Sequence, residues 1–333
     1  MKLLVTGCFG FIGYNFINYV KNNYSNDFEI IGIDSLNEKY SKLNKKKFFE
    51  KNNNFEFYNL DINKIQELEY KIDNVNVLIN FAAESHVDNS ISNPEKFIDS
   101  NISGVAKLMK FAINKNISYF YHVSTDEVYG SSEKNFFFED DKLNPSSPYS
   151  ASKASAELIC NSFMHTYGYN VLMVRPANNY GIYQQPEKLI PFSISSLLSG
   201  KNIELYGDGK NIRHWLHVSD TVTSILHLIE QKYSHGVFNI GSGEYHENLY
   251  VAQKILKYLD LSEEKLIFVE DRPGHDYRYA TNFDKLKNTG WKPKKKFNEE
   301  IEKIVHWYKS NEEWWAEGFE EINQRRENRL NLE

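Results

Sequence analysis

The sequence contains very little cysteine and no long hydrophobic run. Only two of its 333 residues are cysteines, Cys8 and Cys160, so disulfides cannot form a framework and a reducing compartment suits the chain. No apolar stretch approaches the length that spans a bilayer. The first predicted strand begins at Leu3, which leaves no room for a signal peptide. We therefore expect a cytoplasmic protein with no membrane partner.

An excess of positive charge is also absent. The chain carries 39 Lys and Arg against 45 Asp and Glu, a net charge of −6, and so lacks the basic character of nucleic-acid-binding proteins. Its ten histidines, His86, His214, His217 and His275 among them, show no metal-ligand spacing, and we predict no metal site. What is present, 41% hydrophobic and 25% charged residues, is typical of a globular protein long enough for two domains.

Strand-like and helix-like segments alternate through the first half of the chain. Short apolar runs predict strands at 3–5, 29–33, 55–60, 75–79, 119–123 and 171–174, and a helix is expected at 14–22. This alternation predicts the α/β class, with a Rossmann-type, doubly wound parallel sheet in residues 1–175.

The pattern changes after Pro176. There we expect a smaller mixed α/β domain, residues 176–333, with some crossing back of the chain and helices at 218–230, 249–259 and 299–308. The Lys- and Asn-rich stretch 42–54 predicts a solvated helix and loop. The polar tail after Trp315 predicts a solvated helix.

Glycines recur at spacings of three directly after the first strand, in Thr-Gly-Cys-Phe-Gly-Phe-Ile-Gly at 6–13. Gly7 permits the tight turn, Gly10 lets the backbone approach a pyrophosphate, and Gly13 lets the next helix pack close to the sheet. Asp34 ends the second strand, where a carboxylate would bind both ribose hydroxyls and repel a 2′-phosphate. The pattern predicts a dinucleotide site that prefers NAD to NADP.

Tyr149 and Lys153 stand four residues apart, so on a helix they share one face. The lysine ammonium can lower the pKa of the phenol from about 10 and make tyrosinate available as a base. Beside a nicotinamide, such a base helps to remove hydride from an alcohol carbon. Asp126 and Glu127 add an acid and a base, which elimination of water requires and simple oxidation does not. A Tyr-x-x-x-Lys pattern alone is weak; the glycine loop gives it weight.

The glycine spacing together with the downstream Tyr-x-x-x-Lys resembles the extended short-chain dehydrogenase/reductase superfamily, over essentially the whole chain. Within it the sequence is most similar to the nucleotide-sugar 4,6-dehydratases, above all the dTDP-glucose 4,6-dehydratase family. The stretches that carry this resemblance are 81–91 (Phe-Ala-Ala-Glu-Ser-His-Val-Asp-Asn-Ser-Ile), 124–130 (Ser-Thr-Asp-Glu-Val-Tyr-Gly), 178–181 (Asn-Asn-Tyr-Gly), 186–191 (Pro-Glu-Lys-Leu-Ile-Pro) and 271–276 (Asp-Arg-Pro-Gly-His-Asp).

The resemblance implies a reaction in three stages. Tyr149, aided by Lys153, takes the C4 hydroxyl proton while hydride leaves C4 for NAD, and Thr125 hydrogen-bonds the same hydroxyl. Glu127 then removes the C5 hydrogen, and Asp126, kept protonated by a raised pKa, protonates the departing C6 hydroxyl. Hydride returns to C6, so NAD stays tightly bound and is regenerated each turn.

The resemblance also implies which other residues hold the ligands. For NAD these are Gly7, Gly10, Phe11, Ile12, Gly13, Asp34, Ser35, Asp61, Ile62, Phe81, Ala82, Ala83, Ser100, Tyr149, Lys153 and Asn179. For the nucleoside-diphosphate sugar they are Ser85, Asn178, Lys188, Leu189, Tyr206, Arg213, Asn248, Arg272 and His275, with Arg213 on the diphosphate. An arginine after a glycine-rich turn is equally often a surface ion pair. For His86 a loop-ordering role is favoured over a catalytic one.

Some positions depart from the family pattern and leave alternatives open. Ser35 to Tyr40 is more similar to sugar-nucleotide epimerases, His214 stands where an acid is common, and Ala177 stands where Ser is common. Because we expect His214 and Ala177 near the sugar pocket, a UDP- or CDP-linked hexose, including a UDP-N-acetylhexosamine, remains an alternative to dTDP-glucose. A 4-epimerase or a non-catalytic NAD-binding protein are further alternatives.

The superfamily also implies a homodimer, formed by helices that start near Asn101 and Ala151. Ala154, Ile159 and Phe163 are candidate contacts, although packing in the core explains them equally well.

Overall fold

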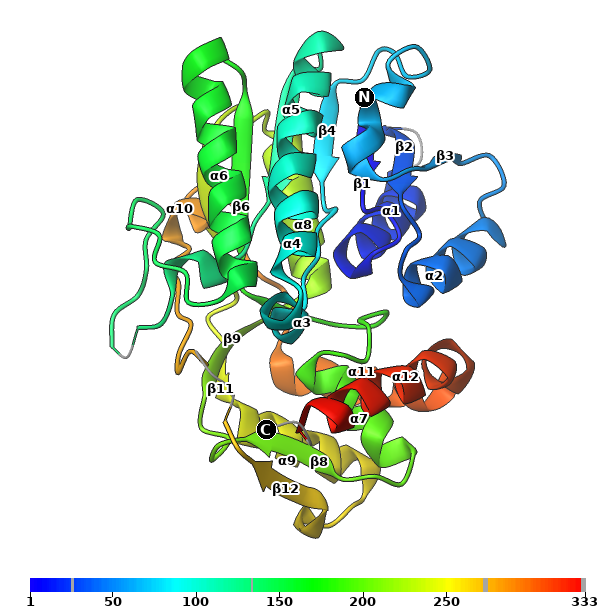
Figure 1. Ribbon diagram of the computed structural model, residues 1–333, viewed down its shortest axis with the longest axis vertical. Coiled ribbons are helices and arrows are strands. Elements are labelled where there is room, and N and C mark those ends of the chain that lie inside the picture. The colour runs from blue at the N-terminus through cyan, green and yellow to red at the C-terminus, as the bar shows by residue number, and fades with distance from the viewer. Residues whose placement is uncertain (25–26, 133, 272–274, 331–333) are drawn as a thin grey trace.

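A seven-stranded parallel sheet organises the larger part of the molecule (Figure 1). The structure is a computed structural model that describes residues 1–24, 27–132, 134–271 and 275–330, the last six of these by their backbone alone. Across the sheet the strands are β10 (Gly236–Ile240), β6 (Val171–Pro176), β5 (Tyr119–Val123), β4 (Val77–Asn80), β1 (Lys2–Thr6), β2 (Glu29–Asp34) and β3 (Glu56–Asn59). All neighbours are parallel, and the strand order reverses between β1 and β4. Ligands of such sheets bind outside the carboxyl ends at this reversal.

Both faces of the sheet are buried, as a parallel sheet requires. Successive residues of β1 point to opposite faces: Leu3 and Val5 join one apolar cluster, and Leu4 joins another. The first cluster is covered by α1 (Phe11–Asn23) and α8 (Val218–Glu230), and the second by α5 (Gly104–Asn114) and α6 (Pro148–Tyr167). The predicted Rossmann-type α/β fold is confirmed.

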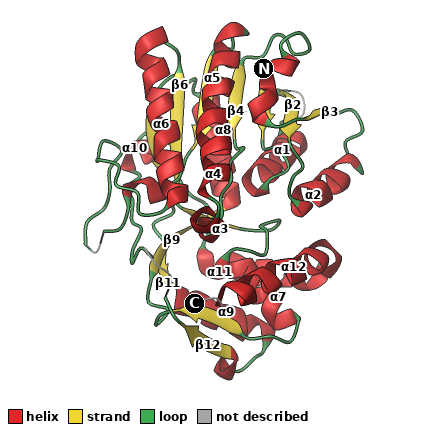
Figure 2. Cartoon of the chain, in the orientation of Figure 1, coloured by secondary structure: helices red, strands yellow, loops and turns green. Residues whose placement is uncertain are grey.

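A smaller part of mixed structure lies beyond the carboxyl ends of the strands (Figure 2). It contains a three-stranded sheet, in the order β11 (Tyr245–Glu247), β9 (Ile212–His217), β7 (Asn178–Tyr180), and a parallel pair, β12 (Leu266–Val269) and β8 (Ile203–Tyr206). Its helices are α7 (Leu189–Leu198), α9 (Asn248–Leu259), α11 (Phe297–Ser310) and α12 (Glu312–Leu330). These elements share a third apolar cluster.

Short elements complete the chain: α2 (Lys39–Phe49), η1 (Ile62–Leu68), α3 (Val87–Ser92), α4 (Pro94–Phe97), η2 (Ile98–Ser103), η3 (Asp126–Tyr129), η4 (Glu263–Lys265) and α10 (Asp284–Lys287). The path returns to the main sheet after residue 176, because α8 packs on α1 and β10 pairs with β6.

Two segments expected to be solvated are instead partly buried. In α2, Tyr40 and Phe48 are 4% and 1% exposed, and in α12 Phe319 is 1% exposed. The two helices also contact each other: the Tyr40 hydroxyl donates to the Trp315 carbonyl (3.2 Å), and Lys39 pairs with Glu317 (2.8 Å). Both helices carry their few apolar residues on one face, which the high polar content of the two stretches conceals.

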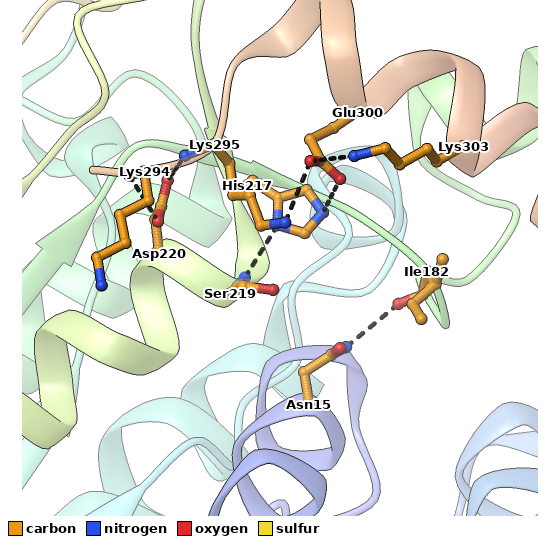
Figure 3. A network of polar contacts seen from close by, with 9 residues as sticks. All are labelled: Asn15, Ile182, His217, Ser219, Asp220, Lys294, Lys295, Glu300 and Lys303. Atoms are coloured by element: carbon orange, nitrogen blue, oxygen red, sulfur yellow. Dashed lines mark hydrogen bonds and ion pairs between the residues drawn. The ribbon is translucent and has the colours of Figure 1, made fainter. Parts of the chain in front are cut away.

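Polar contacts join the two parts of the molecule (Figure 3). The carboxylate of Asp220 on α8 accepts from the N–H groups of Lys294 (3.0 Å) and Lys295 (2.9 Å), just before α11. Glu300 on α11 pairs with Lys303 (2.8 Å) and faces the His217 ring at 4.0 Å. These contacts fix the smaller part against the helices of the sheet. Within the described ranges, no helix has both the length and the apolar character needed to cross a bilayer.

Candidate active site

A cavity of about 360 Å³ opens at the carboxyl ends of β1, β4, β5 and β6. Its wall on the sheet side consists of the glycine loop, residues 81, 83, 85–88 and 123–127, and the start of α6. Its opposite wall comes from 176–179, 184–190 and 204–206, together with single residues of β9 and of the segments near 248 and 275–279. The cavity therefore lies between the two parts of the chain, at the strand-order reversal.

The glycine loop has the geometry of a phosphate cradle. A Cβ on Gly7, whose φ is +65°, would lie 2.6 Å from the Ala82 nitrogen, and one on Gly13 would lie 2.2 Å from the Gly7 oxygen. At Gly10 the nearest such contact is 3.4 Å, so its Cα faces open space. Gly10 also caps α1, whose first N–H groups point toward that space. These features fit a dinucleotide pyrophosphate at a helix N-terminus.

Asp34 is held beside this loop. Its carboxylate accepts from the N–H groups of Phe9 and Leu36, each at 2.9 Å, and burial raises its pKa. Its side chain lies behind the loop and does not line the cavity. Both backbone contacts fix the carboxylate next to the turn after β2, where the sequence places the adenosine ribose.

The predicted cofactor residues divide into two groups. Those that line the cavity are Gly7, Gly10, Phe11, Ile12, Gly13, Phe81, Ala83, Tyr149, Lys153 and Asn179; those that do not are Asp34, Ser35, Asp61, Ile62, Ala82 and Ser100. Asp61 caps η1 by accepting from the Asn63 N–H (2.8 Å), and Ala82 packs against Gly7. Whether members of the second group contact a ligand stays a prediction.

All five predicted catalytic residues line the cavity. Thr125 caps η3 by accepting from the Glu127 N–H (3.2 Å), and its hydroxyl faces the Asp126 Oδ1 at 3.5 Å. The cap places Asp126 and Glu127 in the first turn, directly after β5. Tyr149 and Lys153 reach the same cavity from α6, so the two pairs predicted from separate stretches face one space.

Asp126 is suited to hold a proton. It is 2% exposed, and burial together with the neighbouring Glu127 charge raises its pKa well above the usual range. The pKa shift has the direction expected from the sequence. Its Oδ2 has no hydrogen-bond partner within the described part of the chain. An unpartnered buried carboxyl oxygen at a cavity wall marks a position for a ligand group.

The expected effect of Lys153 on the pKa of Tyr149 stays a prediction, since burial outweighs it in this structure. The Lys153 Nζ donates to the Val123 carbonyl (2.8 Å), and burial lowers the pKa of Lys153 to about 8. The pKa of Tyr149 is raised, by burial first and by the Glu127 charge second. A tyrosinate therefore needs another positive charge close by.

The predicted substrate residues within the described ranges all line the cavity, namely Ser85, Asn178, Lys188, Leu189, Tyr206, Arg213, Asn248 and His275; Arg272 lies outside those ranges. Asn178 and Asn248 each bury a side-chain oxygen with no partner in the described structure. Lys188 reaches across the cavity edge and donates to the Ser85 carbonyl (2.6 Å).

Arg213 is buried and does not form the surface ion pair that the sequence left open. It is 6% exposed, and its guanidinium carbon lies 4.5 Å from the centre of the Tyr279 ring. One of its terminal nitrogens donates to the Asp276 carbonyl and the His275 Nε2, both at 2.9 Å. The same His275 ring contacts Asp271 through Nδ1 (2.6 Å). An arginine oriented in this way at a cavity wall suits an anionic ligand.

The expectation that His214 lies near the sugar pocket is wrong. The His214 ring points away from the cavity, and its Nε2 accepts from the Ser242 and Gly243 N–H groups, both at 2.9 Å. Burial lowers its pKa to about 3. Neighbouring positions on a strand face opposite sides, so the cavity receives Arg213 and His214 supports the loop behind it. Ala177, the other departure, does line the cavity.

Several lining residues were missed, including Trp215, Glu204 and Tyr279. Trp215 stands two residues after Arg213 on β9, and Glu204 two before Tyr206 on β8, so strand alternation could have found both. Tyr279 had no local signal. His86, favoured as a loop-ordering residue, caps α3 by accepting from the Asn89 N–H and contacts the Glu187 carbonyl, each at 3.3 Å. Across the described ranges, no three His, Cys, Asp or Glu side chains gather as a metal site.

Fold and cavity together define a Rossmann-type enzyme of the short-chain dehydrogenase architecture. The model of the GDP-mannose 4,6 dehydratase family matches residues 4–304. The low-salt glycan biosynthesis protein Agl12 of Haloferax volcanii is 39% identical over 94% of this chain and 100% of its own, and the dTDP-glucose 4,6-dehydratase of Escherichia coli is 35% identical over 95% of each. DesIV, the dTDP-glucose 4,6-dehydratase of Streptomyces venezuelae solved with NAD, superposes with a TM-score of 0.91 at 36% identity, over 95% of this chain and 99% of its own. The chain belongs to the NAD-dependent nucleotide-sugar dehydratase and epimerase family, among its 4,6-dehydratases.

Proposed function

We propose that the protein removes water from dTDP-glucose and yields dTDP-4-keto-6-deoxyglucose, with NAD as a tightly held cofactor. The observation that carries the proposal is the meeting, in one cavity, of Asp126 and Glu127 with Tyr149 and Lys153. Epimerisation has no use for an acid and a base beside the oxidising pair. The similarity to dTDP-glucose 4,6-dehydratases supports this substrate over UDP- and CDP-linked hexoses.

The chain offers a complete setting for NAD and for the sugar nucleotide. Residues 1–175 would hold NAD through the glycine loop and Asp34. Residues 176–333 would hold most of the sugar nucleotide, with the Arg213 guanidinium on the diphosphate and the side-chain oxygens of Asn178 and Asn248, which have no partner among the described residues, accepting from its polar groups. When bound, NAD supplies a hydride acceptor, a hydride donor and, in its oxidised form, a positive charge.

The side chains then divide the proton transfers. Tyr149, as tyrosinate, accepts the C4 hydroxyl proton, and the Thr125 hydroxyl orients that group. The Glu127 carboxylate removes the C5 proton, which the C4 ketone makes acidic. Asp126, protonated because of its raised pKa, gives its proton to the departing C6 hydroxyl, which leaves as water. The removed C5 proton returns from Glu127.

Mass spectrometry tests the proposal directly. The purified protein is incubated, without added NAD, with dTDP-glucose, UDP-glucose, CDP-glucose and UDP-N-acetylglucosamine in separate reactions. We expect one water to be lost from dTDP-glucose. Loss from another donor would correct the substrate, whereas no mass change in a protein shown to contain NAD would contradict dehydration and direct the search to epimerisation, which is followed by NMR.

Glu127→Gln separates dehydration from 4-epimerisation. The variant keeps the shape of the side chain and removes the base, so water loss should fall by about a thousandfold or more, within the range spanned by general base catalysis and carboxylate charge. Initial oxidation at C4 should persist, visible as reduced nicotinamide absorbance. An enzyme acting as a 4-epimerase would instead keep nearly full activity in this variant.

A further inference from the structure

Arg175, at the end of β6, makes a set of contacts that the proposed reaction does not use. It is 4% exposed, and its Nε and Nη2 bind both carboxylate oxygens of Glu157 at 2.9 and 2.5 Å. Its Nη1 donates to the Tyr129 hydroxyl and to the Glu139 carbonyl (3.0 Å). A buried pair joined at two points holds both side chains in one geometry. Separating the two would leave each buried charge with neither its partner nor water.

The two ends of this network lead to the two halves of the candidate site. Glu157 stands one helical turn after Lys153 and two turns after Tyr149, on the same face of α6. Tyr129 is the last residue of η3, the short turn that begins with Asp126. Arg175 thus connects the element with the oxidising pair to the element with the acid and base. None of the three side chains in this connection lines the cavity.

Tyr129 is held on every side. Its hydroxyl donates to the Asn239 Oδ1 (2.8 Å), its ring stacks on Phe137 with centres 5.0 Å apart, and it packs against Ala154 of α6. After it, Gly130 turns the chain with φ of +79°, at a place where a Cβ would lie 2.3 Å from the Asn144 oxygen. The position of η3 therefore depends on the Tyr129 hydroxyl, on the packing of the Tyr129 ring and on the turn that follows.

We propose that Arg175 is a positioning residue which, through the Tyr129 hydroxyl, sets Asp126 and Glu127 against the substrate. The inference rests on the proposed dehydration. Loss of the hydrogen bond between Arg175 and the Tyr129 hydroxyl should affect α6 and η3 differently. The 20-residue α6 is anchored in the core by residues such as Ala156 and Cys160, so Tyr149 and Lys153 stay in place. The four-residue η3 has a smaller anchor, Val128 and Tyr129 against Ala154, and depends more on the Tyr129 hydroxyl, so elimination should suffer more than oxidation.

The test is single-turnover kinetics of Tyr129→Phe in the full-length protein as purified with NAD. Reduced nicotinamide absorbance follows oxidation at C4, and mass spectrometry follows water loss. We expect elimination to slow about tenfold, as a displacement of about 1 Å allows, and oxidation to change less than about threefold. Reduced nicotinamide should then accumulate to a higher level than in the wild type, while KM stays within about twofold because substrate contacts are untouched.

Tyr121→Phe is the matched control. Its hydroxyl is also buried and donates to the Tyr233 (2.6 Å) and Leu228 (3.2 Å) carbonyls. Tyr121 lies on β5, next to the strand of Arg175, but does not line the cavity. It should lose comparable stability and accumulate no reduced nicotinamide. Equal slowing of both steps in Tyr129→Phe, or the same kinetics as the control, would overturn the positioning role.

Arg175→Lys provides a second variant should Tyr129→Phe not fold. A lysine keeps a cation opposite Glu157, but its single nitrogen cannot occupy both positions from which Nη2 binds Glu157 and Nη1 binds Tyr129. We expect the same accumulation of reduced nicotinamide, and its absence would count against Arg175. A failure of the proposed function is distinct, because the wild type would then release no water from any donor.

Discussion

At the scale of single residues, burial decides the acid-base chemistry. Asp126 and Tyr149 both have raised pKa values because the cavity wall removes them from water, and the Glu127 charge acts on both in the same direction. The sequence correctly predicts the raised pKa of Asp126, since an adjacent acid is visible in it. It does not show that the Lys153 ammonium donates to the Val123 carbonyl or that burial raises the pKa of Tyr149.

The raised pKa of Asp126 predicts that the stability of the folded protein depends on pH. An unfolded aspartate has a pKa of about 3.9. A folded-state pKa above this value means that the stabilising effect of the neutral acid is full below about pH 4 and is lost as pH rises through the folded-state pKa. Asp126→Asn removes this titration. We expect the Tm of the wild type, measured against the variant by calorimetry, to fall steadily as pH is raised from 4 to 8.

A constant difference in Tm across this range would show that Asp126 is ionised in the fold. Asp208→Asn serves as the control. Asp208 is exposed, and hydrogen bonds from Lys210 lower its pKa, so its contribution to stability changes only below about pH 4 and the difference in Tm should stay constant from pH 4 to 8.

At the scale of elements, the structure agrees with the predicted tight turn at Gly7 and close packing at Gly13, between β1 and α1, whereas the predicted pyrophosphate contact at Gly10 stays a prediction. Each of the three positions requires glycine for a different physical reason, and only two of these reasons concern packing inside the protein. Gly7 and Gly13 face backbone atoms at 2.6 and 2.2 Å, whereas Gly10 faces the cavity. The same spacing in the sequence therefore carries both a folding and a binding requirement.

Alanine variants of this turn should separate the two requirements. Gly13→Ala forces a clash with the Gly7 carbonyl and should lower the free energy of unfolding by about 1–3 kcal/mol. In Gly10→Ala the new methyl group makes only an ordinary contact, so the NAD-free variant should have the same Tm as the NAD-free wild type. The variant should nevertheless contain little NAD when it is purified. Thermal melting and the nicotinamide content of the denatured protein measure the two effects. A Gly10→Ala protein that retained a full complement of NAD would contradict the pyrophosphate cradle.

At the scale of the whole molecule, we infer a homodimer formed through η2, α5 and α6. Ala154, a candidate contact, packs instead against Val128 and Tyr129 in the core. Leu158 on α6 and Ile98 on η2 are 62% and 52% exposed, and two exposed apolar side chains on neighbouring elements suit a face that a second subunit covers. Sequence periodicity could not tell these positions apart, because a long helix packed on two sides has no single apolar stripe.

Leu158→Asp tests this interface. A buried charge at the centre of two paired helices should convert the dimer to a monomer, seen by size-exclusion chromatography with light scattering. Leu261→Asp, at a position that is 37% exposed after α9, should leave the dimer intact. A wild-type protein that is monomeric at micromolar concentration would rule out the arrangement.

The sequence alone determined the fold class, the glycine loop and the Thr125-Asp126-Glu127 and Tyr149-Lys153 sets. These features depend on local patterns: a strand, a tight turn, a helical spacing of four. It also determined which stretches would meet, because the carboxyl ends of parallel strands share one edge.

Only the tertiary structure decided the direction of each side chain and its distance from water. It turned His214 to the loop behind the cavity and Arg213 into it, buried Phe48 and Phe319 in stretches that look solvated, and joined Arg175 to Glu157 and Tyr129. These outcomes depend on contacts between residues far apart in the chain. No local pattern records such contacts, since their free energies exist only once the layers have packed.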